Sequence, residues 1–186
     1  MKCGQRRSTG VNSAMTLPAA APAHIALDFD ALYRSARDDV FAYVAGLLGD
    51  RGAAEDVTAA AFERAYRKRK SYDSRRGSER SWLFGIARNA ALDELRRRKR
   101  RAALVTEPAA VTAAPEEEVE HTLRRAAVRT ALAALPARDH ELIALKFHAG
   151  LDNAEIADVL GVSVTNAGTR LHRALTKLRE ILDDQS

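Results

Sequence analysis

The chain has 186 residues, with 46% hydrophobic but only 5% aromatic residues, and a formal net charge of +5. Alanine and leucine supply most of the apolar content, so the composition favours helices over sheets. The pI near 9.6 agrees with a polyanionic partner. No apolar run approaches the roughly 20 residues of a membrane span, so we expect no membrane insertion. The single cysteine, Cys3, cannot form an internal disulfide and fits a reducing cytoplasm.

The N-terminal part of the chain predicts a leader followed by two helices. Residues 1–25 are polar or alanine-rich and contain Pro18 and Pro22, so we expect a disordered leader rather than a signal peptide. A long apolar stripe at helical spacing predicts a helix over residues 29–48, which Gly49 ends. A second helix is expected over residues 53–68. Without strand patterns, these segments indicate a small helical domain.

The most informative stretch runs from Tyr72 to Arg101. A polar loop over residues 73–81 leads into an amphipathic helix that starts near Ser81, and its apolar face consists of Leu83, Ile86, Ala87, Ala90, Ala91 and Leu95. The outer side carries Trp82, Arg88, Asn89, Asp93, Arg96, Arg97, Arg98, Lys99, Arg100 and Arg101. Cations neutralise phosphates, while aromatic and amide groups contact bases. The stretch therefore predicts a surface for a strand of nucleic acid.

The character of the chain changes after this stretch. Residues 102–121 contain two prolines, many small residues and an acidic cluster, which is the composition of a linker. If flexible, such a linker has a root-mean-square span of roughly 25 Å, so two domains joined by it can dock at separated sites. Helical periodicity then resumes near Thr122 and ends at Pro136, and a further helix is expected over residues 138–147.

A helix-turn-helix pattern follows. The short helix over residues 153–160 meets a turn at Gly161, and a longer helix starts near Val164. The residues expected to lock the two helices together are Ile156, Ala157, Leu160, Val162, Ala167, Leu171 and Leu175. The outer side keeps Thr165, Asn166, Thr169, Arg170, His172, Arg173 and Lys177. Hydroxyl, amide and guanidinium groups are those that read bases in a major groove, so this face predicts DNA binding.

These segments resemble two conserved regions of a known family. The matching pieces include FDALYR, LLGDRGAAEDV, FERAYR, residues 72–101, ALAALPARDHELIALKF, AEIADVLGVSV and TRLHRAL. Residues 29–101 look like the second region, and residues 122–182 like the fourth, of extracytoplasmic-function sigma factors of the sigma-70 family. The resemblance implies an all-α protein with a region 2 helical bundle over residues 26–101 and a region 4 helix-turn-helix domain over residues 122–186. It also implies that the protein joins core RNA polymerase, directs it to promoters and helps to open the DNA.

The resemblance carries roles onto matching positions. The helix over residues 53–68 would bind the largest polymerase subunits, with Asp56, Phe62, Glu63 and Arg64 as contact candidates. The minus 10 element would be recognised, with one base flipped out into the loop, by Tyr72, Arg75, Arg76, Ser81, Trp82, Arg88, Asn89, Asp93, Arg96 and Arg97. The minus 35 element would contact Ser163, Thr165, Asn166, Thr169, Arg170, His172 and Arg173. The acidic linker would lie in the basic channels of the polymerase, or merely separate the domains as a solvated charge run.

Several of these residues could have a structural role or contact only solvent instead of binding DNA, and several others depart from the family pattern. Trp82 could pack into the core, the arginine run could be a solvated helix end, and His172 could contact only solvent. Ala59 and Ala60 stand where relatives commonly have Gln and an acidic residue, which puts the polymerase contact in doubt. Glu79 replaces a residue that is often aromatic, and Ala167 and Gly168 replace a common Val and Lys.

Neither metal-ligand spacing nor a glycine-rich phosphate loop is found, so we expect neither an enzyme nor a cofactor. Two other classes remain open. One is a conventional helix-turn-helix regulator that binds duplex DNA without polymerase, which the match around Trp82 argues against. The other is an interaction protein that occupies polymerase or an inhibitor without opening promoters, which the cationic helix end argues against. As is usual in the group, an anti-sigma protein is expected to hold the factor inactive.

Overall fold

The structure, a computed structural model, describes residues 27–103 and 119–184. Its α-helices are α1 (Phe29–Leu48), α2 (Arg51–Lys68), α3 (Glu79–Ala102), α4 (Val119–Ala134), α5 (Ala137–Ile143), α6 (Asn153–Leu160) and α7 (Val164–Asp183). Short turns η1 (Arg69–Ser71) and η2 (Ser74–Arg76) precede α3, and η3 (Ala144–His148) follows α5. The described ranges contain helices and no strand, so the expected all-α class is confirmed. The expected leader and most of the expected linker lie outside the described residues.

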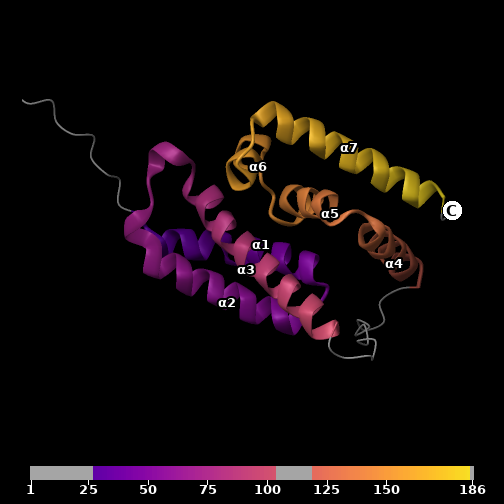
Figure 1. Cartoon of the computed structure of the whole chain (residues 1–186), viewed down its shortest axis with the longest axis horizontal. Helices are drawn as coiled ribbons and strands as arrows, with labels where there is room; N and C mark the ends of the chain where they lie inside the picture. The colour runs from indigo at the N-terminus through magenta and orange to yellow at the C-terminus, as the bar shows by residue number, and fades with distance from the viewer. Residues whose placement is uncertain (1–26, 104–118, 185–186) are drawn as a thin grey trace, which may run out of the picture.

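The helices fall into two groups that lie side by side (Figure 1). We call α1–α3 the N-terminal unit and α4–α7 the C-terminal unit. Helices α1, α2 and α3 pack on one another, while α6 packs on both α3 and α7. Among the described helices, none combines the length and the apolar character needed to cross a membrane.

Polar caps set the starts of the first two helices. The Asp28 carboxylate accepts the N–H of Ala31 at 3.0 Å, and Asp50 accepts that of Ala53 at 3.2 Å. Between them Gly49 ends α1 with φ at 62°, a conformation that glycine adopts without steric cost. Helix α2 therefore begins at Arg51, two residues before the expected start at residue 53, because Asp50 caps it.

Two later helix boundaries also differ from expectation. Helix α3 begins at Glu79 rather than near Ser81, because Ser78 caps it by accepting the N–H of Ser81 at 3.0 Å. The helix expected over residues 138–147 is divided: α5 ends at Ile143 and continues into η3, a wider π-type turn. In that turn the N–H of Ala149 donates to the carbonyl of Ala144 at 3.0 Å.

One hydrophobic core extends through both units. Its fully buried large side chains include Val40, Tyr43, Leu83 and Phe84 of the N-terminal unit and Leu145, Leu151 and Ile156 of the C-terminal unit. The expected apolar face of the central helix is buried or half-buried, and Phe84, which the sequence pattern missed, is buried with it. A smaller cluster of Leu135, Ile143 and Ala174 lies within the C-terminal unit. The two units are thus joined by apolar packing as well as by the chain.

The helix-turn-helix expectation is confirmed in its packing. Ile156, Ala157, Ala167 and Leu171 are buried, and Leu160, Val162 and Leu175 pack against the same core. Asp152 and Glu155 form a capping box at the start of α6, and Gly161 ends that helix with φ at 65°. Ser163 then caps α7 by accepting the N–H of Asn166 at 3.2 Å.

Arg98 fastens the end of α3 to the turn between α1 and α2. Its guanidinium donates to the carbonyl of Leu48 at 3.1 Å, to Asp50 at 2.9 Å and to Glu94 at 3.1 Å. Glu94 is itself buried, with 9% of its surface exposed. One member of the expected phosphate-binding run is therefore committed to holding the fold.

Replacing Gly168 with alanine is expected to stabilise the protein by up to about 1 kcal/mol, because alanine is the better helix former. A Cβ at this position would lie 3.5 Å from the amide nitrogen of Asn153, an ordinary contact distance. Urea unfolding followed by circular dichroism measures the change. A lower midpoint in Gly168→Ala would contradict the described packing of α7 on α6.

Arg98→Ala is expected to lower the free energy of unfolding by about 2 kcal/mol, because hydrogen bonds to charged groups contribute about 1.5–3 kcal/mol and Arg98 is only partly buried. Arg101→Ala, at the exposed end of the same helix, is the matched control. This substitution should change the free energy of unfolding by less than about 0.5 kcal/mol. Equal effects of the two substitutions in the same urea titration would count against a structural role for Arg98.

Candidate nucleic-acid interface

The loop before α3 is held by its own side chains. The Tyr72 hydroxyl donates to the carbonyl of Gly77 at 3.1 Å, and its ring meets Trp82 edge-on with centroids 5.7 Å apart. Asp73 accepts the backbone N–H of Arg75 at 3.1 Å and binds its guanidinium through two hydrogen bonds of 2.9 Å. The loop therefore presents a fixed arrangement of an aromatic pair and a braced cation.

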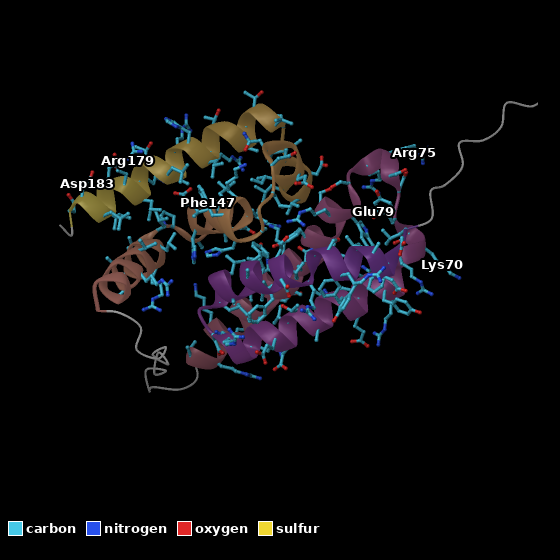
Figure 2. The ribbon with its side chains drawn as sticks, turned by 180° about the vertical axis from the view of Figure 1, so that it is seen from behind. Lys70, Arg75, Glu79, Phe147, Arg179 and Asp183 are labelled. Atoms are coloured by element: carbon cyan, nitrogen blue, oxygen red, sulfur yellow. The ribbon has the colours of Figure 1, made fainter. Side chains whose placement is uncertain are left out.

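Trp82 is half-buried against the core, so its packing role is present whether or not it also contacts a base. Burial raises the pKa of the Tyr72 phenol, and the carboxylates of Glu79 and Asp73 raise it further. Glu79 thus adds its charge beside the aromatic pair. Figure 2 places Arg75 and Glu79 at the end of the molecule opposite to Arg179 and Asp183 of α7.

The cations along α3 are in different situations. Arg96 and Arg97 are exposed over 66% and 53% of their side chains and pair locally with Asp93 at 2.8 Å and Glu94 at 2.6 Å. The Arg96–Asp93 pair is exposed on both sides and contributes at most about 1 kcal/mol, so a phosphate can replace its carboxylate at little cost. Glu94 is buried, but it keeps Arg98 as a partner when Arg97 turns to a ligand. Asn89 is exposed on the same helix. Arg96 and Arg97 are thus available to a ligand, whereas Arg98 is not.

Three residues in the N-terminal half of α3 contact the C-terminal unit. Arg88 pairs with Glu141 of α5 at 2.6 Å, and the Glu141 side chain is only 8% exposed. The expectation that Arg88 lies on an open outer face is wrong, because a partner distant in sequence covers it. Ser81 is 4% exposed, and its Oγ lies 3.4 Å from Asp158 Oδ2. Arg80, which the sequence analysis did not select, binds Asp39 at 2.7 Å and the carbonyl of Ala149.

Burial and nearby charges shift the pKa values of two side chains where α1 meets the C-terminal unit. Burial raises the pKa of the Tyr43 phenol, and the charge of Glu141 adds to this rise. The pKa of His140 is lowered, mainly by burial and further by His148. Uncharged forms of Tyr43 and His140 are therefore favoured where the two units meet.

The recognition face of α7 is open. Its exposed residues are Ser163, Thr165, Asn166, Thr169, Arg170, His172 and Arg173. The Thr169 hydroxyl already donates to the carbonyl of Thr165 at 2.9 Å, and the Ser163 hydroxyl caps the helix. Lys177 pairs with Asp139 at 2.6 Å and is thereby held against α5. Arg170 and Arg173 remain as exposed guanidinium groups on this face, and Ala167 belongs to the core.

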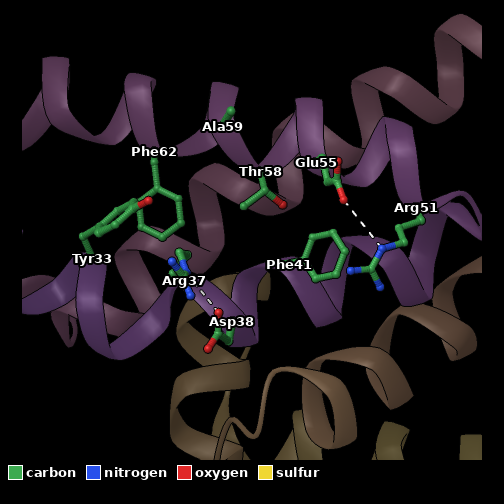
Figure 3. A pocket seen from close by; sticks show the side chains of 9 residues that line it. All are labelled: Tyr33, Arg37, Asp38, Phe41, Arg51, Glu55, Thr58, Ala59 and Phe62. Carbon is green, nitrogen blue, oxygen red and sulfur yellow. Dashed lines mark hydrogen bonds and ion pairs between the residues drawn. The ribbon is translucent and has the colours of Figure 1, made fainter.

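A third surface lies between α1 and α2, where an open groove of about 600 Å³ is lined by Tyr33, Arg37, Asp38, Phe41, Arg51, Glu55, Thr58, Ala59 and Phe62 (Figure 3). Two ion pairs border it, Arg37 with Asp38 at 3.0 Å and Arg51 with Glu55 at 3.6 Å. Phe62 is 6% exposed and stacks edge-on with Tyr33, so it supports the groove from below rather than projecting outward. The other polymerase-contact candidates, Asp56, Glu63 and Arg64, are exposed on α2.

The described residues contain no group of three or more His, Cys, Asp or Glu side chains that could hold a metal ion. Their polar surfaces offer hydrogen bonds and charges to a macromolecular ligand. Two such surfaces, the loop with α3 and the open face of α7, suit nucleic acid. The groove between α1 and α2 is separate from both.

Two family matches cover the two units. Residues 32–101 match Sigma-70 region 2, and residues 125–178 match Sigma-70 region 4. The first match contains α3 and its loop, and the second contains the helix-turn-helix pair. Each candidate nucleic-acid surface therefore lies within one matched region.

The chain is similar to curated relatives over most of its length. It is 33% identical over 169 residues to the ECF RNA polymerase sigma factor SigL of Mycobacterium tuberculosis, which covers 89% of this chain and 94% of that protein. It is 31% identical over 162 residues to the ECF RNA polymerase sigma factor BldN of Streptomyces coelicolor, covering 85% of this chain but 61% of that longer protein.

Solved structures show the same fold. The sigma factor RpoE from Bartonella quintana, solved in complex with the anti-sigma factor NepR, matches 84% of this chain and 97% of its own with a TM-score of 0.69 at 24% identity. CnrH, solved in complex with the cytosolic domain of CnrY, matches 85% of this chain and 89% of its own with a TM-score of 0.64 at 25% identity. Sequence and fold thus agree, and the chain belongs to the ECF sigma factors of the sigma-70 family.

Proposed function

We propose that this chain binds core RNA polymerase, directs it to specific promoters and assists their opening. The observation that carries the proposal is the presence of two polar surfaces on separate units: a braced loop with α3 and an open α7 face. Each surface lies in the family region that bears its expected role. The chain would act as a transcription initiation factor that binds without catalysis or a cofactor, in the cytoplasm.

We assign polymerase docking to α2 and the groove beside it. Asp56, Glu63 and Arg64 supply exposed charges on this helix, and Ala59 lines the groove. With alanine at residues 59 and 60, the contact would depend more on apolar surface and less on hydrogen bonds than in relatives with polar residues there. The expected partner is the largest subunits of core polymerase.

We assign the minus 10 element to the loop and the outer side of α3. The half-buried Trp82 beside Tyr72 offers an aromatic surface for an unstacked base, while Arg96 and Arg97 offer cations for the strand. Unstacking a base costs a few kcal/mol, which stacking at about 1–3 kcal/mol per base can offset. Arg75 and Arg76 would approach phosphates from the loop.

We assign the minus 35 element to the open face of α7. Arg170 and Arg173 extend from it, with Thr165, Asn166 and His172 nearby on exposed positions. A helix N-terminus inserted in the major groove places such side chains at base edges. Binding to polymerase makes the second DNA contact effectively intramolecular, so neither unit needs high affinity alone.

We also propose that an anti-sigma protein holds this chain inactive. The support comes from the structural neighbours RpoE, solved in complex with the anti-sigma factor NepR, and CnrH, solved in complex with the cytosolic domain of CnrY. Recovery of a polypeptide inhibitor with the chain from unstressed host cells is the expected result. Recovery of polymerase alone, with the inhibitor absent in every condition, would contradict this part of the proposal.

A conventional helix-turn-helix regulator is the second candidate, because the α7 face is exposed without any need for polymerase. Such a protein would bind duplex promoter DNA alone and would open none. Promoter opening therefore separates the two functions.

Permanganate footprinting of host promoter DNA is expected to reveal unpaired thymines only when this chain and core polymerase are both present, because melting needs both the strand surface and the enzyme. The two components tested separately, and a known sigma factor with the same core polymerase, are the controls. Duplex binding by the chain alone, with no opening in the mixture while the control factor opens its own promoter, would favour the regulator.

Arg173→Glu is expected to weaken promoter binding by the polymerase complex by at least about tenfold, because a lost contact of 1–3 kcal/mol is compounded by repulsion between a carboxylate and DNA. Arg179→Glu on the same helix is the matched control, since its side chain lies near the far end of α7 (Figure 2). Gel-shift titration of the minus 35 region measures both, and equal losses would remove the specific role from Arg173.

A further inference from the structure

The start of α7 carries an exposed apolar side chain that the assigned DNA contacts do not use. Val164 is the first residue of this helix, and it is 52% exposed. A single exposed valine is ordinary on a protein surface, so its position decides its meaning. The first residues of a recognition helix are those that meet base edges in the major groove. Valine is also a poor helix former, so the helix itself does not favour it there.

The position one turn after Val164 has no side chain. Residues four apart lie on the same side of a helix, so Gly168 is the neighbour of Val164 along α7. The fold does not require glycine here, because the φ of Gly168 is not positive and a Cβ would meet, beyond its own helix, only the Asn153 amide nitrogen at 3.5 Å. Glycine does allow a ligand to approach the backbone closely. Val164 and Gly168 together form an apolar surface that we call the α7 strip.

Two threonine hydroxyls of α7 are already engaged within the helix. The Thr169 hydroxyl donates to the carbonyl of Thr165 at 2.9 Å, and the Thr176 hydroxyl donates to that of His172 at 3.1 Å. A hydroxyl has a single hydrogen to donate, so neither group has one left for a base. Base readout by α7 therefore depends less on threonine donors, and more on its amide and guanidinium groups and on the α7 strip.

Thymine is the base that an apolar surface distinguishes, because it presents a C5 methyl group in the major groove. We propose that the α7 strip reads the methyl group of one thymine in the minus 35 element. Val164 makes the apolar contact, and Gly168 lets the edge of the base pair come close to the helix backbone. The assignment of α7 to the minus 35 element rests on the proposed function, whereas the methyl contact applies to any duplex that α7 binds.

Deoxyuridine tests this contact directly, because it lacks the C5 methyl group of thymidine and keeps the hydrogen-bonding groups of the base. Each thymine in the minus 35 region of a host promoter duplex is replaced singly by deoxyuridine. Gel-shift titration then measures binding by the full chain, alone and with core polymerase. We expect one replacement to weaken wild-type binding by about fourfold, which is the effect of removing one buried methyl group.

Three variants assign the contact to residues. Val164→Ala should fold normally, since alanine is the better helix former, and should lose the sensitivity to the critical deoxyuridine. Val128→Ala is the matched control, because it removes a valine that is 41% exposed on α4, and it should keep the full sensitivity. Gly168→Ala should bind the unmodified duplex more weakly than the wild type although its folded state is no less stable, which separates close approach from folding.

Equal wild-type affinity for every singly replaced duplex would overturn the methyl contact. The same loss at one position in Val164→Ala as in the wild type would overturn its assignment to Val164, and unchanged binding by Gly168→Ala would overturn the close approach. Failure of the proposed function has a different signature. The chain would then open no promoter with core polymerase on unmodified DNA, while the effect of deoxyuridine on duplex binding by the chain alone would remain.

Discussion

Helix α3 is packed from two sides, and this constraint organises the rest of the structure. Its alanines at residues 87, 90 and 91 let it lie close to α1 and α2, while Ser81 and the glycine-containing loop before it let α6 lie close to its start. The same helix carries the residues assigned to the minus 10 element. The C-terminal unit therefore packs against the helix that carries these residues.

The arginines of this helix show how charge divides between structure and function. Arg98 holds the turn between α1 and α2, and Arg88 is held by a buried carboxylate. Arg96 and Arg97 are paired only within the helix and remain exposed. A buried pair is costly to break because its partner loses its counter-charge, whereas an exposed pair exchanges easily with a phosphate. Positive charge on a helix is consequently a poor guide to ligand contact until the partner of each cation is known.

Much of the fold could be predicted from local pattern. The spacing of apolar residues located α1, α6 and α7, and Gly49 and Gly161 marked helix ends, because these signals depend on residues close in sequence. Apolar spacing alone puts the starts of α2 and α3 two residues late, because the polar caps Asp50 and Ser78 lie outside the apolar pattern. The wide turn η3 has no distinctive local pattern.

The candidate site was predictable in composition but not in accessibility. The residue types on α3 and α7 indicated nucleic acid, and the family match places each set in its expected region. Sequence spacing could not reveal that Glu141 reaches Arg88 or that Arg80 binds the carbonyl of Ala149, because such pairs join distant segments. The role of Gly46 was also hidden from the sequence pattern. Glycine inside a helix costs up to about 1 kcal/mol of stability relative to alanine. The reason for it here is the close approach of the His148 ring from the unit packed against α1.

The most direct test of this account is a distance measurement between the two units in the free chain. Spin labels at cysteines replacing the exposed residues Arg67 of α2 and Thr176 of α7, with Cys3 changed to serine, would report that distance by pulsed electron paramagnetic resonance. The account predicts one narrow distance in the free chain, because a shared buried core joins the two units. A broad distribution in the free chain would contradict it.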